Sequence, residues 1–152
     1  MNHSTTISDE VIDSLSNLVE VNRDCQKCFQ EAASKIDTPY IKSFCLEQSL
    51  SRAKFVDELQ AQILSLGVEP EDTGSVAGAL QRGWMNLKSA LGGGDHAILA
   101  VTESGEDHAI KAYMKALEEA LPEPVREMVE RQLQGVKQSH LKVKELRDSL
   151  KK

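Results

Sequence analysis

The sequence predicts an all-α protein, a four-helix bundle with a long helical connection between its second and third helices. Apolar residues recur at helical spacing in four long segments, and no segment alternates apolar and polar residues with the period of a strand. The length of 152 residues suits one domain, 1–152, with one core. Aromatic residues make up only 4% of the chain, so we expect that core to be aliphatic.

The first predicted helix begins after Ser8, a plausible N-cap, with two acidic residues in its first turn. The second begins at Pro39 with Thr38 as its N-cap and stops at Gly67. The two apolar faces contain Val11, Leu15, Leu18, Asn22, Cys25, Phe29, Ala33 and Ile36 in the first helix, and Ile41, Phe44, Phe55, Leu59, Ile63 and Leu66 in the second.

The third predicted helix follows Gly94, with Asp95 as its N-cap, and two prolines, Pro122 and Pro124, end it and start the fourth. The two apolar faces contain Leu99, Glu106, Ile110, Tyr113 and Leu117 in the third helix, and Val125, Val129, Gln132, Val136, His140, Val143 and Leu150 in the fourth.

The lengths of the connections predict the topology. Short connections make two antiparallel helix hairpins, about 8–67 and 95–150. The connection between them, 68–94, is far longer than a simple turn needs. Since a helix of about 28 residues spans roughly 40 Å, a strap of this length can cross the bundle and start the third helix at the opposite end.

An apolar stripe runs along this strap and includes the only tryptophan, Trp84. We expect Trp84 to anchor a crossover helix against the bundle; the alternative is a hydrophobic lid that lifts for a partner or a membrane. The stripe consists of Val76, Leu80, Trp84, Leu87 and Leu91.

The chain also resembles the bacterial ferritin-like four-helix-bundle family of unknown function. The most specific part is Gly78–Lys88, GALQRGWMNLK. Other motifs that carry the resemblance are Asn22-Arg-Asp24, Phe29-Gln-Glu-Ala-Ala33, Arg52 with Phe55 and Glu58-Leu59, and Gly105-Glu-Asp107 with Lys111-Ala-Tyr113. The resemblance covers nearly the whole chain and implies a fold, but no established activity.

Ferritin-like di-iron proteins bind metal with a glutamate on each of two helices and a Glu-x-x-His motif on each of the other two. No Glu-x-x-His occurs in this sequence. A site with fewer ligands could still bind iron or another divalent metal. Its candidate ligands are Glu47, Glu103, Glu106 and His140. We expect no cofactor, and we keep a carboxylate-bridged metal protein as the alternative.

Polar residues fall on or beside the apolar faces, where charge is costly unless it is paired. One interpretation is that Arg52 supplies the positive charge of a lost metal and pairs with Glu106 or Glu103; the other is that some of these residues reach solvent at the edges of the faces. This candidate buried polar layer consists of Asn22, Gln26, Gln48, Arg52, Thr102, Glu106 and Gln132.

Three cysteines form the last candidate set. Cys25 and Cys28 make a Cys-x-x-Cys pair, but at mid-helix, without the helix N-terminus that makes such thiols acidic. Cys45 falls at a similar level of the bundle. We expect buried, inert thiols, with a thiol sensor as a further alternative.

Composition excludes several functions. The net charge of −6 argues against a nucleic-acid surface, no apolar run is long enough to span a membrane, and the polar start lacks the apolar region of a signal peptide. An odd cysteine count without an export signal favours the cytoplasm. Because no catalytic set can be proposed, we expect a non-catalytic, homo-oligomeric bundle with a binding or stress-protection role and an unknown ligand.

Overall fold

A computed structural model describes residues 9–68 and 94–150. The expected cap at Ser8 and the expected strap with its anchor Trp84 lie outside these residues.

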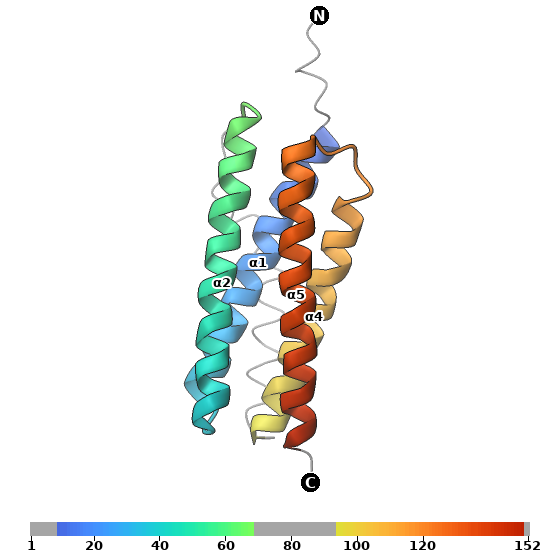
Figure 1. Ribbon diagram of the computed structural model, residues 1–152. Coiled ribbons are helices and arrows are strands. Elements are labelled where there is room, and N and C mark those ends of the chain that lie inside the picture. Colours follow the sequence, from blue (N-terminus) through green and yellow to red (C-terminus); the bar gives the residue numbers. More distant parts are fainter. Residues whose placement is uncertain (1–8, 69–93, 151–152) are drawn as a thin grey trace, which may run out of the picture.

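The described residues form four α-helices and no strand, which confirms the predicted all-α class (Figure 1). None of these helices is both long enough and apolar enough to cross a membrane. Their bounds are Asp9–Lys35 for α1, Pro39–Ser65 for α2, Gly94–Ala116 for α4 and Glu123–Ser149 for α5.

Helix α2 begins where it was predicted to begin, after the short α1–α2 connection, with Thr38 at the N-cap position and Pro39 in the first helical turn. The Thr38 side chain, however, does not cap α2. Its Oγ1 donates a hydrogen bond of 3.1 Å to Oδ2 of Asp95, and the backbone amides of Thr38 and Asp37 also donate to the Asp95 carboxylate. Asp95 was predicted to cap α4; it lies inside the first turn of α4 instead and binds the α1–α2 turn.

The other helix ends depend on residues close to them in the sequence. Gly67 follows α2 with φ of 88°, a conformation that favours glycine. Pro122 occupies the N-cap position of α5. The guanidinium of Arg126 donates hydrogen bonds to the carbonyls of Leu117 and Glu119, which ties the connection between α4 and α5 to the start of α5.

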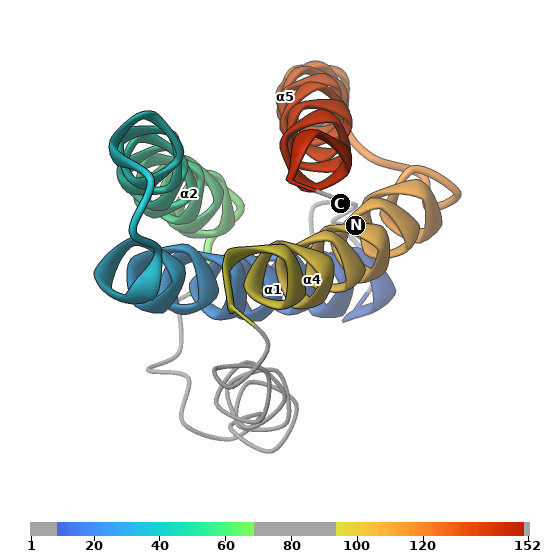
Figure 2. The same ribbon diagram turned by 90° about the horizontal axis from the view of Figure 1, so that it is seen from below.

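The arrangement of the helices places α1 beside both α2 and α4, and α4 beside α5 (Figure 2). Helix α2 ends at one end of the bundle, and α4 begins at the other (Figure 1). Helices α2 and α5 are further apart and meet through a few side chains, such as the Phe55 ring, whose Cζ is 3.2 Å from the place of a Cβ on Gly135. Glycine at 135 therefore makes room for Phe55.

Among the described residues the core has two apolar clusters, which consist mostly of buried aliphatic residues. The larger cluster includes Leu15, Leu18, Leu59, Val129 and Val136, and the smaller includes Phe29, Ile36, Ile41, Leu99 and Val143. Each of the four described helices also contributes buried polar residues to this interior, and these residues form the candidate site.

Candidate functional site

An ion pair between α2 and α4 forms the centre of the polar layer. Nη2 of Arg52 lies 2.6 Å from Oε2 of Glu106, and the two side chains are 0% and 1% exposed. The same nitrogen donates a hydrogen bond of 2.5 Å to Oγ of Ser139 on α5, which in turn donates to Glu106. Three helices are thus joined by one charged, hydrogen-bonded cluster.

Aromatic rings and burial set the electrostatics of this cluster. The guanidinium carbon of Arg52 lies 5.4 Å from the ring centroid of Phe29 and 5.9 Å from that of Phe55, within the range of cation–π attraction. Burial raises the pKa of Glu106 above its ordinary value, and the charge of Arg52 opposes that rise. The paired cation is therefore what favours the ionised carboxylate in this low-dielectric position.

A second network crosses the bundle through Tyr113. Nδ2 of Asn22 donates hydrogen bonds of 2.8 Å to the Tyr113 hydroxyl and to the Leu18 carbonyl, and the hydroxyl donates to Oε1 of Gln132 at 2.6 Å. Nε2 of Gln132 then donates to Oε1 of Glu58 at 2.9 Å. Asn22, Tyr113 and Gln132 are completely buried, and burial raises the pKa of the Tyr113 hydroxyl, so this tyrosine stays a neutral donor.

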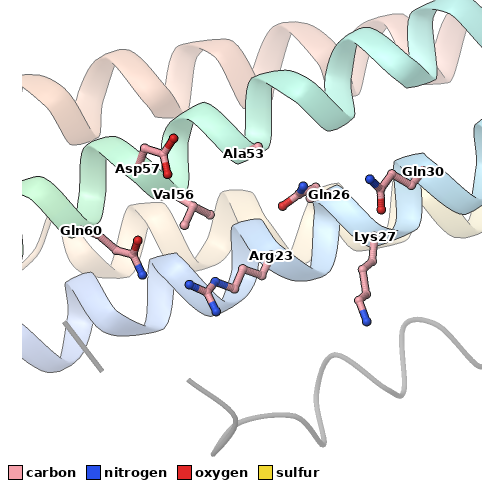
Figure 3. A pocket seen from close by; sticks show the side chains of 8 residues that line it. All are labelled: Arg23, Gln26, Lys27, Gln30, Ala53, Val56, Asp57 and Gln60. Carbon is pink, nitrogen blue, oxygen red and sulfur yellow. The ribbon is translucent and has the colours of Figure 1, made fainter. Parts of the chain in front are cut away.

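Two glutamines of the expected layer lie at its edge. Gln26 and Gln48 are half-buried, whereas Asn22, Arg52, Thr102, Glu106 and Gln132 are buried. Gln26 lines a polar groove between α1 and α2, because its position is rotated from the core toward α2. Figure 3 shows this groove with its lining residues Arg23, Gln26, Lys27, Gln30, Ala53, Val56, Asp57 and Gln60.

The four candidate metal ligands are not brought together. Glu47 is exposed on α2, whereas Glu106 is buried and paired with Arg52. Glu103 accepts a hydrogen bond from Arg147 and lies 3.7 Å from Nε2 of His140. Glu47 lies on the exposed side of α2, whereas Arg52 on the same helix is buried.

The donor chemistry does not fit a two-metal centre. Glu106 is neutralised by Arg52 and Glu103 is paired with Arg147, while His140 Nε2 lies 2.7 Å from Oδ1 of Asp107. Among residues 9–68 and 94–150, no three histidine, cysteine or acidic side chains are grouped as metal ligands would be. A two-metal centre needs several carboxylates free to bridge the ions, and here salt bridges already engage them.

The three cysteines are buried free thiols. Burial raises the pKa of Cys25 and of Cys45 to about 12 and raises that of Cys28 as well. Since the thiolate is the nucleophile, this environment opposes redox reactivity at neutral pH.

We expect all three thiols of the folded protein to react slowly with a thiol reagent at pH 7, because raised pKa values leave little thiolate and burial blocks access. The measurement is the labelling rate in buffer against the rate in denaturant. Rapid labelling of Cys25 or Cys28 in the folded protein would support the thiol sensor instead.

Several residues of the site were not found from the sequence. Ser139 joins the Arg52–Glu106 pair, Tyr113 was placed only on an apolar face, and Glu58 ends the second network. A signal for Tyr113 existed, since a buried tyrosine hydroxyl needs a hydrogen-bond partner. Serine is common on helix surfaces, so Ser139 had no such signal.

Fold and site together define an all-α four-helix bundle with a charged and polar centre. Residues 10–119 match the family described as Domain of unknown function (DUF2383), and the chain belongs to this family. No curated protein matches the sequence.

Proposed function

We propose that this chain is a non-catalytic, ferritin-like bundle that acts in the cytoplasm, as a homo-oligomer, in binding or stress protection and without a resident metal. The observation that carries the proposal is the Arg52–Glu106 pair: the cation at the centre of the bundle is a guanidinium. A ferritin-like crossover is supported by the positions of α2 and α4, which end and begin at opposite ends of the bundle.

The absence of catalysis is supported by the chemistry of the buried groups. Burial raises the pKa of Tyr113 and of the three cysteines, which disfavours their ionised forms. Arg52 pairs with the Glu106 carboxylate, and hydrogen bonds within the bundle already use the Tyr113 and Ser139 hydroxyls. The hydrogen-bonded polar groups join the helices to one another, and a buried polar network can specify the register in which helices pack.

A metal-binding protein remains the second candidate function. It is favoured by the position of the His140 imidazole on α5, whose Nε2 lies near the carboxylates of both Glu103 and Asp107 on α4. These three groups are not arranged as metal ligands in the described residues, so a single divalent ion would bind them only after displacing Arg147 from Glu103 and moving their side chains.

Metal analysis separates the two candidates. We expect protein purified without chelator to carry far less than one metal ion per chain, and its melting temperature to be unchanged by a chelator or by added Fe²⁺ or Zn²⁺, because a ligand stabilises only what it binds. About two irons per chain, lost in Glu106→Leu, would establish the di-metal alternative. One ion per chain lost in His140→Ala would instead indicate the α4–α5 site.

A further inference from the structure

Helix α2 has apolar residues on its outer face as well as on its buried face. Ile41, Leu59 and Ile63 are buried in the core, while Leu46, Leu50 and Leu64 on the other side are 49%, 72% and 57% exposed. Single exposed leucines are common on protein surfaces, but several on one helix face mark an interaction surface.

The outward side of α5 has a different character. It carries exposed charged residues such as Glu130, Lys137 and Lys144, with Leu141 as a single exposed leucine. The concentration of leucine on α2 is therefore a property of this helix and not of helix surfaces in this bundle generally.

At 100° per residue, the exposed leucines of α2 share a face with two small residues and two opposite charges. We call this face the α2 outer face, and it consists of Leu46, Leu50, Ala53, Lys54, Asp57, Ala61 and Leu64. Ala53 and Asp57 also line the groove between α1 and α2, so the face continues into that groove (Figure 3). Lys54 and Asp57 take part in none of the ion pairs formed within the described residues.

The α2 outer face matches itself when a second copy is placed antiparallel to it. About a twofold axis between residues 55 and 56, Lys54 lies opposite the partner's Asp57 and Leu50 opposite the partner's Ala61. Leu46 lies within about one residue, or 1.5 Å, of the level of the partner's Leu64. Each contact occurs twice, as an isologous interface requires. The apolar pairs occupy the ends and the complementary charges the centre, over about 27 Å of helix at 1.5 Å per residue.

We propose that the α2 outer face binds a second copy of this chain, through an antiparallel α2–α2 contact centred between Lys54 and Asp57. This contact is the interface of the homo-oligomer in the proposed function, on which the inference rests. It does not depend on whether the bundle binds a metal. A different protein is the disfavoured occupant, because opposite charges placed at equal distances from one point, with a leucine near each end, complement a second copy of the same face and have no reason to arise for an unrelated surface.

Charge reversal of the full-length chain tests this contact by sedimentation equilibrium. We expect a wild-type dimer, and in Lys54→Glu and Asp57→Lys a dissociation constant raised about tenfold or more, because two attractive contacts become repulsive in each homodimer. Mixing the two variants should restore dimers, since the introduced glutamate of one chain then faces the introduced lysine of the other, and the remaining Asp57 faces the remaining Lys54. The double variant should also dimerise like the wild type.

An apolar substitution gives an independent test. Leu50→Glu should yield monomers with an unchanged helical circular dichroism spectrum, whereas the matched control Leu141→Glu, at a leucine of similar exposure on α5, should still dimerise. A monomeric wild type at concentrations near 100 μM, well above the micromolar range of weak interfaces, would overturn the dimer. A Leu50→Glu variant that stays dimeric, or charge variants that fail to complement each other, would leave an oligomer possible but overturn this surface.

Discussion

Replacing Arg52 by leucine is expected to lower the free energy of unfolding by about 3–5 kcal/mol. The guanidinium is completely buried and lies 2.6 Å from the Glu106 carboxylate. Its removal leaves that carboxylate in a low-dielectric core with Ser139 as its remaining donor. The measurement is chemical denaturation of the variant against the wild type.

The pH dependence of this loss has a definite sign. Without Arg52, the pKa of Glu106 in the folded state rises further above the value of about 4.3 for an unfolded glutamate. A raised folded-state pKa gives stability that is present below the unfolded value and lost as the pH rises. The deficit of Arg52→Leu should therefore be smaller near pH 4 than at pH 7.

The double variant Arg52→Leu with Glu106→Leu should recover most of the loss, because well-packed apolar residues can replace a buried ion pair. Arg131→Leu is the matched control, because it removes the ion pair with Glu58, in which the Arg131 side chain is 60% exposed. This variant should lower the free energy of unfolding by less than about 1 kcal/mol. Additive losses in the double variant would show that Arg52 and Glu106 are not energetically coupled.

Truncating Phe29 to alanine is expected to cost about 3–5 kcal/mol, as for other fully buried aromatic residues. Phe29 is 0% exposed, packs edge-on against Phe44 with ring centroids 6.2 Å apart, and lies under the guanidinium of Arg52. Phe29→Ala therefore leaves a cavity and removes a cation–π contact at once.

The matched control for this variant is Phe44→Ala, at the half-buried partner ring, and it should cost clearly less. The effects of Phe29→Ala and Arg52→Leu should be less than additive, since both remove the same contact. A loss below about 1 kcal/mol for Phe29→Ala would mean that neither the packing nor the cation–π contact contributes as the structure indicates.

Local patterns determined the helices. The spacing of apolar residues predicted all four described segments, and Pro39, Gly67 and Pro122 marked their ends, because proline and glycine act on the backbone where they stand. Where a side chain had a choice of partners, the local pattern did not determine which partner it binds. Thr38 and Asp95 each had the residue type of an N-cap, but they bind each other at one end of the bundle instead.

An all-α bundle with polar residues on its apolar faces follows from the order of residues alone, since both features come from the 3.6-residue period within one helix. Which polar groups meet was settled by the packing of the helices. The Arg52–Glu106 contact joins positions on separate helices, and the addition of Ser139, the link from Tyr113 to Gln132, and the exposure of Glu47 depend equally on how each helix is rotated and shifted along its neighbours. Those rotations result from the packing of the whole core, which no single segment contains.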